Sequence, residues 1–325
     1  MACGSPRITS LWAWPAAAAF CALAVCYGEA RRPSEKRSSQ VEAPSDRDLP
    51  GFRAFVINLD SQRGRLQGFN AAVGKHQPWM ASVMHRVAGI DGHRLLSNKT
   101  VIRDMLGRGV IGPKDLEGAL KHEHGAYGWG DLSPGAVGLY LSHFKAWKEI
   151  VSKGLRFGLI FEDDLRFFAS GFEPALRRIL REEPKVDLAY FQHCLDSSAW
   201  PPGAESPETS AFSSSSYLGP TASYRSVAPD ELVPCLAAYL LSNRGARRLL
   251  RIAFPISQQL DMAVSNASAW KGLRRIVFEP ALAQVGPESY TSSVQDNSLC
   301  QKWGWKAVSM LGMWSRHLFY PWCAI

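Results

Sequence analysis

Three adjacent carboxylates, Glu162, Asp163 and Asp164, end the short apolar run of residues 159–161. Carboxylates held this close repel one another and lose hydration, and a divalent cation with its preference for oxygen ligands relieves both costs. If the run is a β-strand, alternate side chains share a face, so Glu162 and Asp164 are expected to project together. Open α/β sheets collect ligands at the carboxyl ends of their strands. The triplet predicts a metal site suited to a diphosphate, and the alternative is an acidic loop that only caps a buried strand.

The elements that must position this triplet follow from the apolar pattern. Residues 54–59 (AFVINL) form a short apolar run typical of a buried strand. A helix is expected over residues 65–72 and a second strand over residues 83–87, before a glycine-marked turn at residues 88–92. Residues 93–131 show no clear period, so an irregular connection is expected there.

The clearest helix begins after Ser133. This serine is a candidate N-cap, Pro134 suits the first helical position, and Gly154 suits the stop. One apolar face repeats at three- and four-residue steps. Its members are Val137, Tyr140, Leu141, Phe144, Trp147 and Val151. Gly135 and Gly138 are poor helix formers, which predicts that another group approaches the backbone there, and helix N-termini are natural phosphate sites.

The second half of the chain continues the alternation of strands and helices. Buried strands are expected at residues 159–161, 187–191, 236–241 and 275–278. Helices are expected at residues 174–181, from Asn243 as N-cap to residue 251, and from Ser257 as N-cap through Asp261. The serine- and proline-rich residues 196–217 predict a long surface loop. The alternation predicts an α/β fold in which helices flank the sheet.

Composition and the N-terminal segment indicate the class of protein and its compartment. Hydrophobic residues make up 46% of the 325, as in a globular protein with a large core. The net charge of +8 comes without a basic run longer than two, which suits an anionic substrate and gives no sign of nucleic-acid binding. Residues 11–27 are uncharged and mostly apolar, as in a secretory signal peptide. A signal anchor is the alternative, although basic residues at 31–37 lie on the wrong side for a lumenal domain.

Taken in order, these motifs resemble glycosyltransferase family 25, which holds bacterial lipooligosaccharide galactosyltransferases and animal procollagen galactosyltransferases. The resemblance covers residues 52–295. Its matching pieces are residues 56–60 (VINLD) with Arg65, 88–92 (AGIDG), 132–147 (LSPGAVGLYLSHFKAW), 159–164 (LIFEDD), 238–250 (AYLLSNRGARRLL) and 255–261 (PISQQLD). Two positions depart from the family pattern, since Ala136 stands where a glutamate is usual and Leu139 where a cysteine is usual.

The resemblance implies a GT-A-type nucleotide-diphospho-sugar transferase fold with a mixed sheet. It also implies a UDP-sugar donor, usually Mn²⁺, and inverting transfer of galactose or glucose to a hydroxyl on a glycan, protein or lipid. Glu162 and Asp164 are the expected metal ligands. Asp261, on the acceptor half, is the candidate general base, and an exposed helix aspartate is the alternative. Donor contacts are expected from Asn58, Leu59, Arg65, Asp91, Ser142, His143 and Asp163.

These expectations divide the chain into four segments. Residues 1–30 are a signal peptide or signal anchor and a candidate membrane contact, residues 31–50 a disordered stem, residues 51–299 the glycosyltransferase 25-like domain, and residues 300–325 an aromatic-rich tail. The implied location is the lumen of the endoplasmic reticulum or Golgi. Two glycosylation sequons, at Asn98 and Asn266, agree with secretory entry. Four cysteines outside the N-terminal segment, Cys194, Cys235, Cys300 and Cys323, suit disulfides.

Two other functions compete with an active transferase. A secreted, catalytically silent relative that binds glycan or protein is favoured by Ala136 and opposed by the intact triplet. A metal-dependent phosphohydrolase needs an activated water or a phosphoryl-accepting nucleophile, and no local motif supplies one. Release of UDP from several UDP-sugars, with and without acceptor, separates the three.

Overall fold

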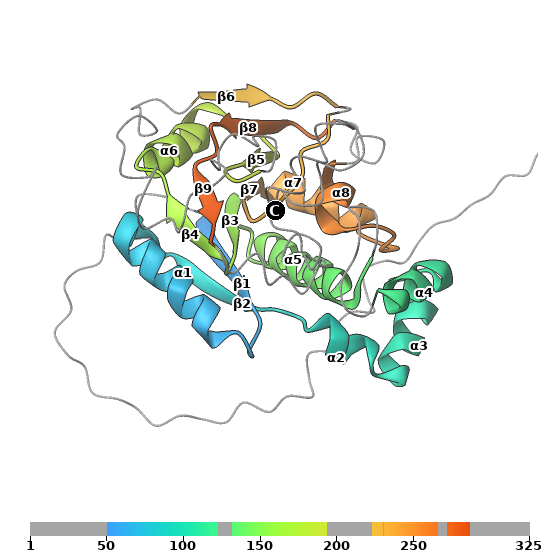
Figure 1. The fold of residues 1–325 in the computed structure, drawn as a ribbon. Helices are drawn as coiled ribbons and strands as arrows, with labels where there is room; N and C mark the ends of the chain where they lie inside the picture. The colour runs from blue at the N-terminus through green and yellow to red at the C-terminus, as the bar shows by residue number, and fades with distance from the viewer. Residues whose placement is uncertain (1–50, 123–131, 194–222, 230, 266–271, 287–325) are drawn as a thin grey trace, which may run out of the picture. The chain divides into compact units, whose positions relative to one another are not determined.

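The computed structural model describes residues 51–122, 132–193, 223–229, 231–265 and 272–286. The predicted signal peptide and stem, the surface loop at residues 196–217, the C-terminal tail and the sequon at Asn266 lie outside these residues. Within them, strands and helices alternate along the chain, as Figure 1 shows. No helix in the described ranges has the length and apolarity that crossing a membrane requires.

A seven-stranded mixed sheet forms the centre of the fold. In spatial order its strands are β2 (Met84–Ala88), β1 (Phe52–Asn58), β3 (Phe157–Glu162), β7 (Ala238–Ser242), β5 (Leu188–Tyr190), β8 (Arg275–Glu279) and β6 (Ser223–Ser226). β7 runs antiparallel to both of its neighbours, and β6 runs antiparallel to β8. The other pairs are parallel. Directly after the acidic triplet, β4 (Leu165–Phe168) forms a separate antiparallel pair with β9 (Ala283–Val285).

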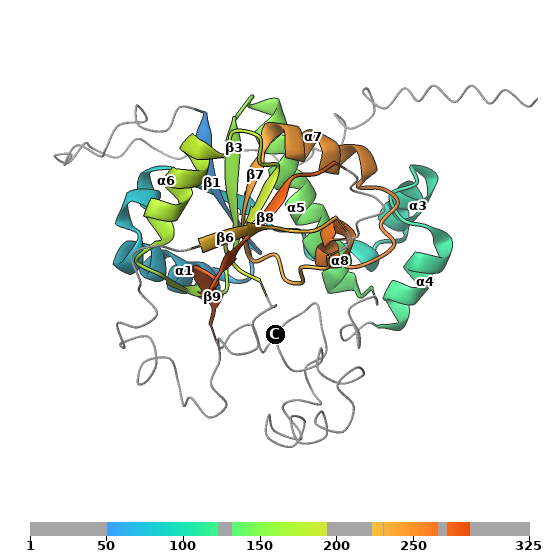
Figure 2. The ribbon, with the colours of Figure 1, turned by 90° about the horizontal axis from the view of Figure 1, so that it is seen from above.

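Helices cover both faces of this sheet, as Figure 2 shows. The face that receives Ile160 of β3 packs against α5 (Pro134–Ser152), α7 (Asn243–Ile252) and α8 (Leu260–Ser265). The opposite face, which receives Leu159 and Phe161, packs against α1 (Arg63–His76) and α6 (Phe172–Glu182). Neighbouring residues of β3 therefore enter different cores, because side chains alternate across a strand.

The ends of α5 confirm the sequence prediction. The Ser133 hydroxyl accepts a hydrogen bond from the Ala136 N–H at 3.0 Å, and Gly154 adopts a φ of 61° just beyond the helix. The close approach predicted at the glycines exists at Gly138. A Cβ there would lie 2.4 Å from the Ile90 carbonyl oxygen and 2.6 Å from the Gly92 nitrogen. The group that approaches Gly138 is therefore protein backbone rather than a phosphate.

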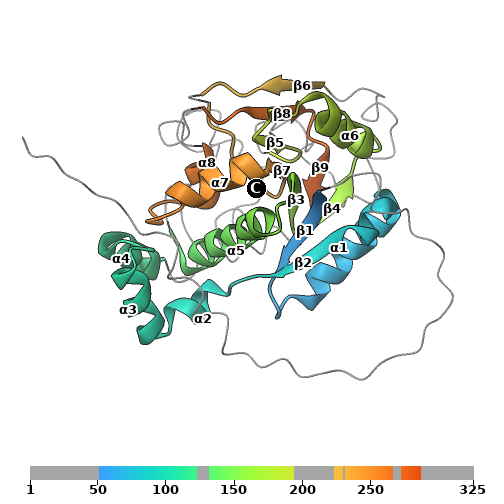
Figure 3. The same ribbon diagram turned by 180° about the vertical axis from the view of Figure 1, so that it is seen from behind.

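Three short helices replace most of the irregular connection expected over residues 93–131. They are α2 (Gly92–Leu96), α3 (Lys99–Gly107) and α4 (Pro113–Lys121), and they follow the short 3₁₀ helix η3 (Pro78–Ser82) and β2 in the chain. Figure 3 shows these three helices near one end of α5. The prediction failed because these helices are too short for a clear period. Their caps were readable, since Asp91 and Asn98 accept hydrogen bonds from backbone N–H groups of α2 and α3.

Two predicted N-caps in the second half are wrong. Ser242, not Asn243, caps α7, because the Ser242 hydroxyl accepts the Gly245 N–H at 3.0 Å. The Asn243 amide is used elsewhere, donating to the Leu155 carbonyl at 2.9 Å. Ser257 does not cap α8, which begins only at Leu260, because the preceding segment is held extended by a bridge between Ile256 and Ile111.

Candidate active site

The acidic triplet lies where β3 ends, and its carboxylates have different partners. β3 ends at Glu162, and Asp163 and Asp164 form the turn that leads into β4. Glu162 directs its Oε1 toward α5, where it lies 3.5 Å from Nε2 of His143. Asp163 and Asp164 both contact Arg65 of α1. We expected Glu162 and Asp164 to project from one face of a strand that continues through Asp164. The strand instead ends at Glu162, so strand alternation does not set the direction of the Asp164 side chain.

Arg65 bridges the second and third carboxylates of the triplet. Its Nη2 lies 2.9 Å from Oδ1 of Asp163 and 3.0 Å from Oδ2 of Asp164. The other oxygen of Asp163 accepts a hydrogen bond of 2.6 Å from the Asn58 amide. The other oxygen of Asp164, Oδ1, is buried and has no hydrogen-bond partner in the described part of the chain. Asp163 is thus held at both oxygens, whereas Asp164 keeps one buried oxygen for a ligand.

Burial perturbs both aspartates. It raises the pKa of Asp164 to about 7, and the nearby charge of Glu162 acts in the same direction while Arg65 opposes it. Burial also raises the pKa of Asp163, against the lowering effects of Arg65 and Asn58. Perturbed carboxyl groups concentrate at functional sites because function requires charge where solvation is poor.

The triplet fits a hard divalent cation that would take only two of its ligands from the protein. Among the described residues, no group of three or more His, Cys, Asp or Glu side chains is arranged to hold a metal ion. The fit depends on the buried, unpartnered Oδ1 of Asp164, and on Glu162, whose Oε2 makes no hydrogen bond or ion pair within the described ranges. A cation that takes its remaining ligands from diphosphate oxygens and water needs no more than one or two carboxylates. Glu162 and Asp164 are the residues that would hold it.

Asn58 organises the end of β1 beside the triplet. Besides Asp163, its amide contacts the Gln62 carbonyl at 2.9 Å, and its Oδ1 accepts a hydrogen bond of 2.9 Å from Nε of Arg86. Arg86, on β2, also pairs with the exposed Asp60. Arg86 was not among the expected site residues, although a cation inside the expected strand at residues 83–87 was a visible signal.

Three other expected donor residues lie in or beside the junction between the β2–α2 turn and α5. Asp91 is exposed and accepts the Arg94 N–H at 3.0 Å as the cap of α2. Ser142 is buried and accepts the Ile90 N–H at 2.8 Å. Leu59 is partly buried just after β1. These contacts give Asp91 and Ser142 structural roles, and direct donor contact by any of the three stays a prediction.

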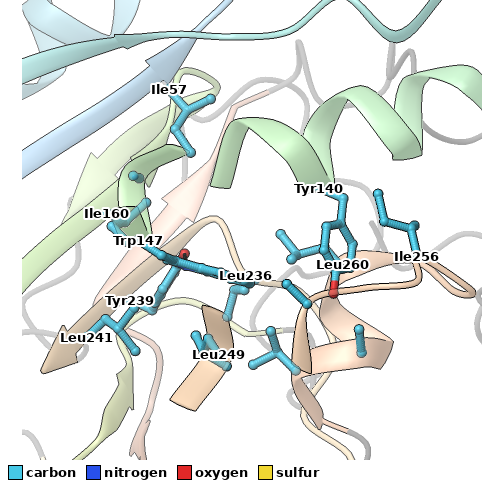
Figure 4. Packing of buried hydrophobic residues seen from close by; sticks show 14 of the residues in the cluster. Ile57, Tyr140, Trp147, Ile160, Leu236, Tyr239, Leu241, Leu249, Ile256 and Leu260 are labelled. Atoms are coloured by element: carbon cyan, nitrogen blue, oxygen red, sulfur yellow. Dashed lines mark hydrogen bonds between the residues drawn. The ribbon is translucent and has the colours of Figure 1, made fainter. Parts of the chain in front are cut away.

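His143 lies behind the triplet rather than on an open surface. It is fully buried, stacks on Tyr239 with ring centroids 5.7 Å apart, and has its Nδ1 2.9 Å from the Tyr239 oxygen. The indole N–H of Trp147 donates to the same oxygen at 2.8 Å. Figure 4 shows Trp147 and Tyr239 together in the apolar cluster between the sheet and α5. Tyr239 was not among the expected site residues, and its only signal was a phenol inside an apolar strand.

Asp261, the candidate base, lies in the first turn of α8 and is half-buried. Its carboxylate accepts the Cys235 N–H at 3.2 Å and the Met262 N–H at 2.8 Å. Burial raises the pKa of Asp261, and the charge of Glu162 contributes to the same shift. Asp261 is thus half-buried rather than exposed, and its role as general base stays a prediction. Cys235 is disulfide-bonded and is the only cysteine among the described residues.

The fold and this site together define a class of protein. A seven-stranded mixed sheet with helices on both faces and carboxylates at the end of an inner strand is compatible with a nucleotide-sugar transferase fold. A family model described as glycosyltransferase family 25 (LPS biosynthesis protein) matches residues 52–264. The chain belongs to glycosyltransferase family 25.

Relatives of the chain include a protein named as a galactosyltransferase and a protein named as inactive. It is 26% identical over 294 residues to procollagen galactosyltransferase 1 of Danio rerio, which covers 84% of this chain and 42% of that protein. It is 34% identical over 161 residues to inactive glycosyltransferase 25 family member 3 of Homo sapiens, which covers 49% of this chain and 24% of that protein. The chain thus matches less than half of the length of either relative.

Proposed function

We propose that this protein transfers a hexose, galactose or glucose, from a UDP-sugar to a hydroxyl group on a glycan or protein, with inversion at the anomeric carbon and with Mn²⁺ or another divalent cation. The observation that carries the proposal is the carboxylate cluster at the end of β3, where Asp164 keeps a buried, unpartnered oxygen. Family membership supports the transferase chemistry. The similarity to a procollagen galactosyltransferase supports galactose as the sugar.

Inverting transfer needs stabilisation of the leaving diphosphate. A bound cation would supply Lewis-acid stabilisation of that charge. Glu162 and Asp164 would hold the cation, while Asn58 fixes Asp163 at 2.6 Å. Arg65 neutralises Asp163 and Asp164 at 2.9 and 3.0 Å, and it places a guanidinium beside the position where the diphosphate would bind.

The reaction also needs a group that removes the proton from the acceptor hydroxyl. Asp261 is suited to this role because a carboxylate with a raised pKa is a stronger base near neutral pH. Its two backbone hydrogen bonds, from Cys235 and Met262, hold the carboxylate in one orientation. Each carboxylate oxygen has a second lone pair, so these bonds still allow it to accept a proton.

Release of UDP tests the proposal directly. The full chain is incubated with UDP-galactose or UDP-glucose and Mn²⁺, with and without a hydroxyl acceptor, and UDP is measured. Acceptor-dependent UDP release that Asp164→Asn abolishes supports the proposal. The matched control is Asp104→Asn, because Asp104 pairs with Arg108 on the surface of α3, away from the triplet. Equal release by wild type and Asp164→Asn contradicts it.

The proposed location is the lumen of the secretory pathway. The apolar segment at residues 11–27 supports it, and so does the disulfide-bonded Cys235, since disulfides persist in oxidising compartments. N-terminal sequencing of protein secreted or retained by expressing cells tests the proposal. A mature N-terminus after about residue 30 is expected for a cleaved signal peptide. An intact N-terminus on protein found in the cytosol contradicts the location.

A catalytically silent relative is the second candidate, and a specific observation favours it. Ala136 of α5 stands where a glutamate is usual in the family. It is 1% exposed and packs in the apolar cluster between α5 and the sheet. A human relative is named inactive. In this case Mn²⁺-dependent binding of UDP without transfer to any acceptor is expected, and calorimetry beside the release assay separates the two candidates.

A further inference from the structure

We infer that Trp147 and Tyr239 hold His143 as the neutral tautomer with its proton on Nε2, and that this N–H orients the Glu162 carboxylate for a diphosphate-bound cation. His143 is then a positioning residue rather than a donor contact. The inference rests on the proposed function, because it takes Glu162 as a metal ligand.

The contacts of the Tyr239 hydroxyl determine where its proton points. The Trp147 indole N–H can only donate, so the Tyr239 oxygen accepts it at 2.8 Å. Tyr239 is fully buried, and burial raises the pKa of its phenol well above the ordinary value, so the phenol keeps its proton. Within the described residues, Nδ1 of His143, at 2.9 Å, is the one acceptor in reach of that proton.

The same contacts assign the tautomer of His143. If Nδ1 carried a proton, Trp147 and His143 would both donate to one oxygen, and the buried Tyr239 hydroxyl would have no acceptor. Buried donors without acceptors are costly and therefore rare. Nδ1 consequently accepts from Tyr239, and the proton of the neutral ring lies on Nε2. Stacking at an interplanar angle of 14° on Tyr239 restricts rotation of the imidazole ring.

This proton links His143 to the triplet. Nε2 of His143 is buried and makes no hydrogen bond within the described residues; Oε1 of Glu162 lies 3.5 Å from it, slightly beyond the usual hydrogen-bond distance of about 2.7–3.2 Å, and is the acceptor that the inference assigns to a proton on Nε2. Glu162 has no other hydrogen bond or ion pair among the residues that the structure describes. A neutral donor orients the carboxylate without cancelling its charge, which leaves Oε2 available to a cation. Partners of this kind behind metal ligands commonly tune affinity.

The tautomer is measurable without metal or substrate. In metal-free protein with ¹⁵N-labelled histidine, two-bond ¹H–¹⁵N correlations distinguish the two neutral tautomers and the imidazolium form, and His143→Gln identifies the signal. The expected pattern at pH 7.5 is a neutral ring protonated on Nε2. A ring protonated on Nδ1, or on both nitrogens, overturns the inference. This measurement uses the wild-type chain, so it does not depend on a variant that folds.

The orienting role is tested with Tyr239→Phe, which removes the hydroxyl and keeps the ring. We expect a mixed tautomer signal and about tenfold weaker binding of Mn²⁺ in the presence of UDP, measured from free Mn²⁺ by electron paramagnetic resonance. The matched control is Tyr224→Phe, whose hydroxyl contacts Glu183 at 3.0 Å from the edge strand β6. Unchanged Mn²⁺ affinity in Tyr239→Phe with an altered tautomer overturns the orienting role.

One further variant separates this inference from the proposed function. Glu162→Gln removes the charge and keeps the length of the side chain. If it binds Mn²⁺ as tightly as the wild type, the metal role of Glu162 fails, and the orienting role fails with it. The tautomer assignment of His143 would stand, because it depends only on Trp147 and Tyr239.

Discussion

The two sides of the acidic triplet have partners of opposite kinds. Glu162 faces a buried chain of contacts that runs from Trp147 through Tyr239 to His143, which we infer to be a chain of neutral donors. Asp163 and Asp164 face the guanidinium of Arg65. A neutral donor sets the geometry of a carboxylate and leaves its charge, whereas a cation cancels that charge.

This difference shows how one short motif can serve two purposes. Because β3 ends at Glu162, that side chain lies against His143 of α5, while the turn that follows places Asp163 and Asp164 against Arg65 in the first turn of α1. Arg65 stabilises the two buried carboxylates when no other cation is bound. Glu162 keeps its charge and offers an oriented oxygen to a ligand. The comparison predicts that variants on the two sides differ in their effect on metal binding.

The largest effect is expected from Asp261→Asn, which lies outside both sides of the triplet. Removing a general base typically slows transfer by on the order of 10²–10⁴-fold. Affinity for the UDP-sugar should stay unchanged, because both sides of the triplet are intact. Steady-state kinetics of transfer and calorimetry with UDP measure the two quantities. Transfer at the wild-type rate would show that the base lies elsewhere.

Asp164→Asn tests the charged side of the triplet. Several kcal/mol of charge stabilisation depend on a bound cation, so its loss should slow transfer about 10²-fold or more. The fold should survive, because the amide is nearly isosteric with the carboxyl group it replaces. Mn²⁺-dependent turnover and circular dichroism measure both outcomes. Near-normal turnover in Mn²⁺ would remove Asp164 from the site.

Arg65→Met sharpens the comparison by removing the cation from one side only. Hydrogen bonds to charged groups contribute about 1.5–3 kcal/mol, so the metal-free variant should unfold at a lower temperature. Mn²⁺ should then raise the melting temperature of the variant more than that of the wild type, because the carboxylates have lost their counter-charge. Arg108→Met, which breaks an exposed pair with Asp104, is the matched control. Equal Mn²⁺ effects in Arg65→Met and wild type would contradict the role given to Arg65.

The pH dependence of stability tests Asp164 without metal or substrate. The pKa of Asp164 rises from an ordinary 3.8 to about 7 on folding, so between these values the folded state holds a proton that the unfolded state has released. The contribution of Asp164 to the stability of the metal-free protein should therefore be greatest below pH 4 and should decline as pH rises toward 7. Asp164→Asn cannot titrate and should show a flatter profile in urea unfolding. Identical profiles would mean that Asp164 ionises normally.

Most of the fold was predictable because its signals are local. The apolar run at residues 54–59 became β1, and the Ser133 cap with Gly154 set the limits of α5. Short helices such as α2 were missed because five residues show no period. The N-caps at Asn243 and Ser257 were misplaced because several polar residues near a helix start are all plausible caps. Only the extended backbone around Ile256 excludes Ser257.

The sequence by itself determined the family, the alternation of the main strands and helices, and the acidic triplet at the end of an inner strand. These features depend on neighbouring residues and on spacing along the chain. Only the tertiary structure decided which carboxylate meets which partner. His143 and Tyr239 are 96 positions apart, and Arg65 reaches Asp164 only because α1 packs against the sheet beside the end of β3. No local pattern records such contacts, because they arise from packing between elements that are distant in the sequence.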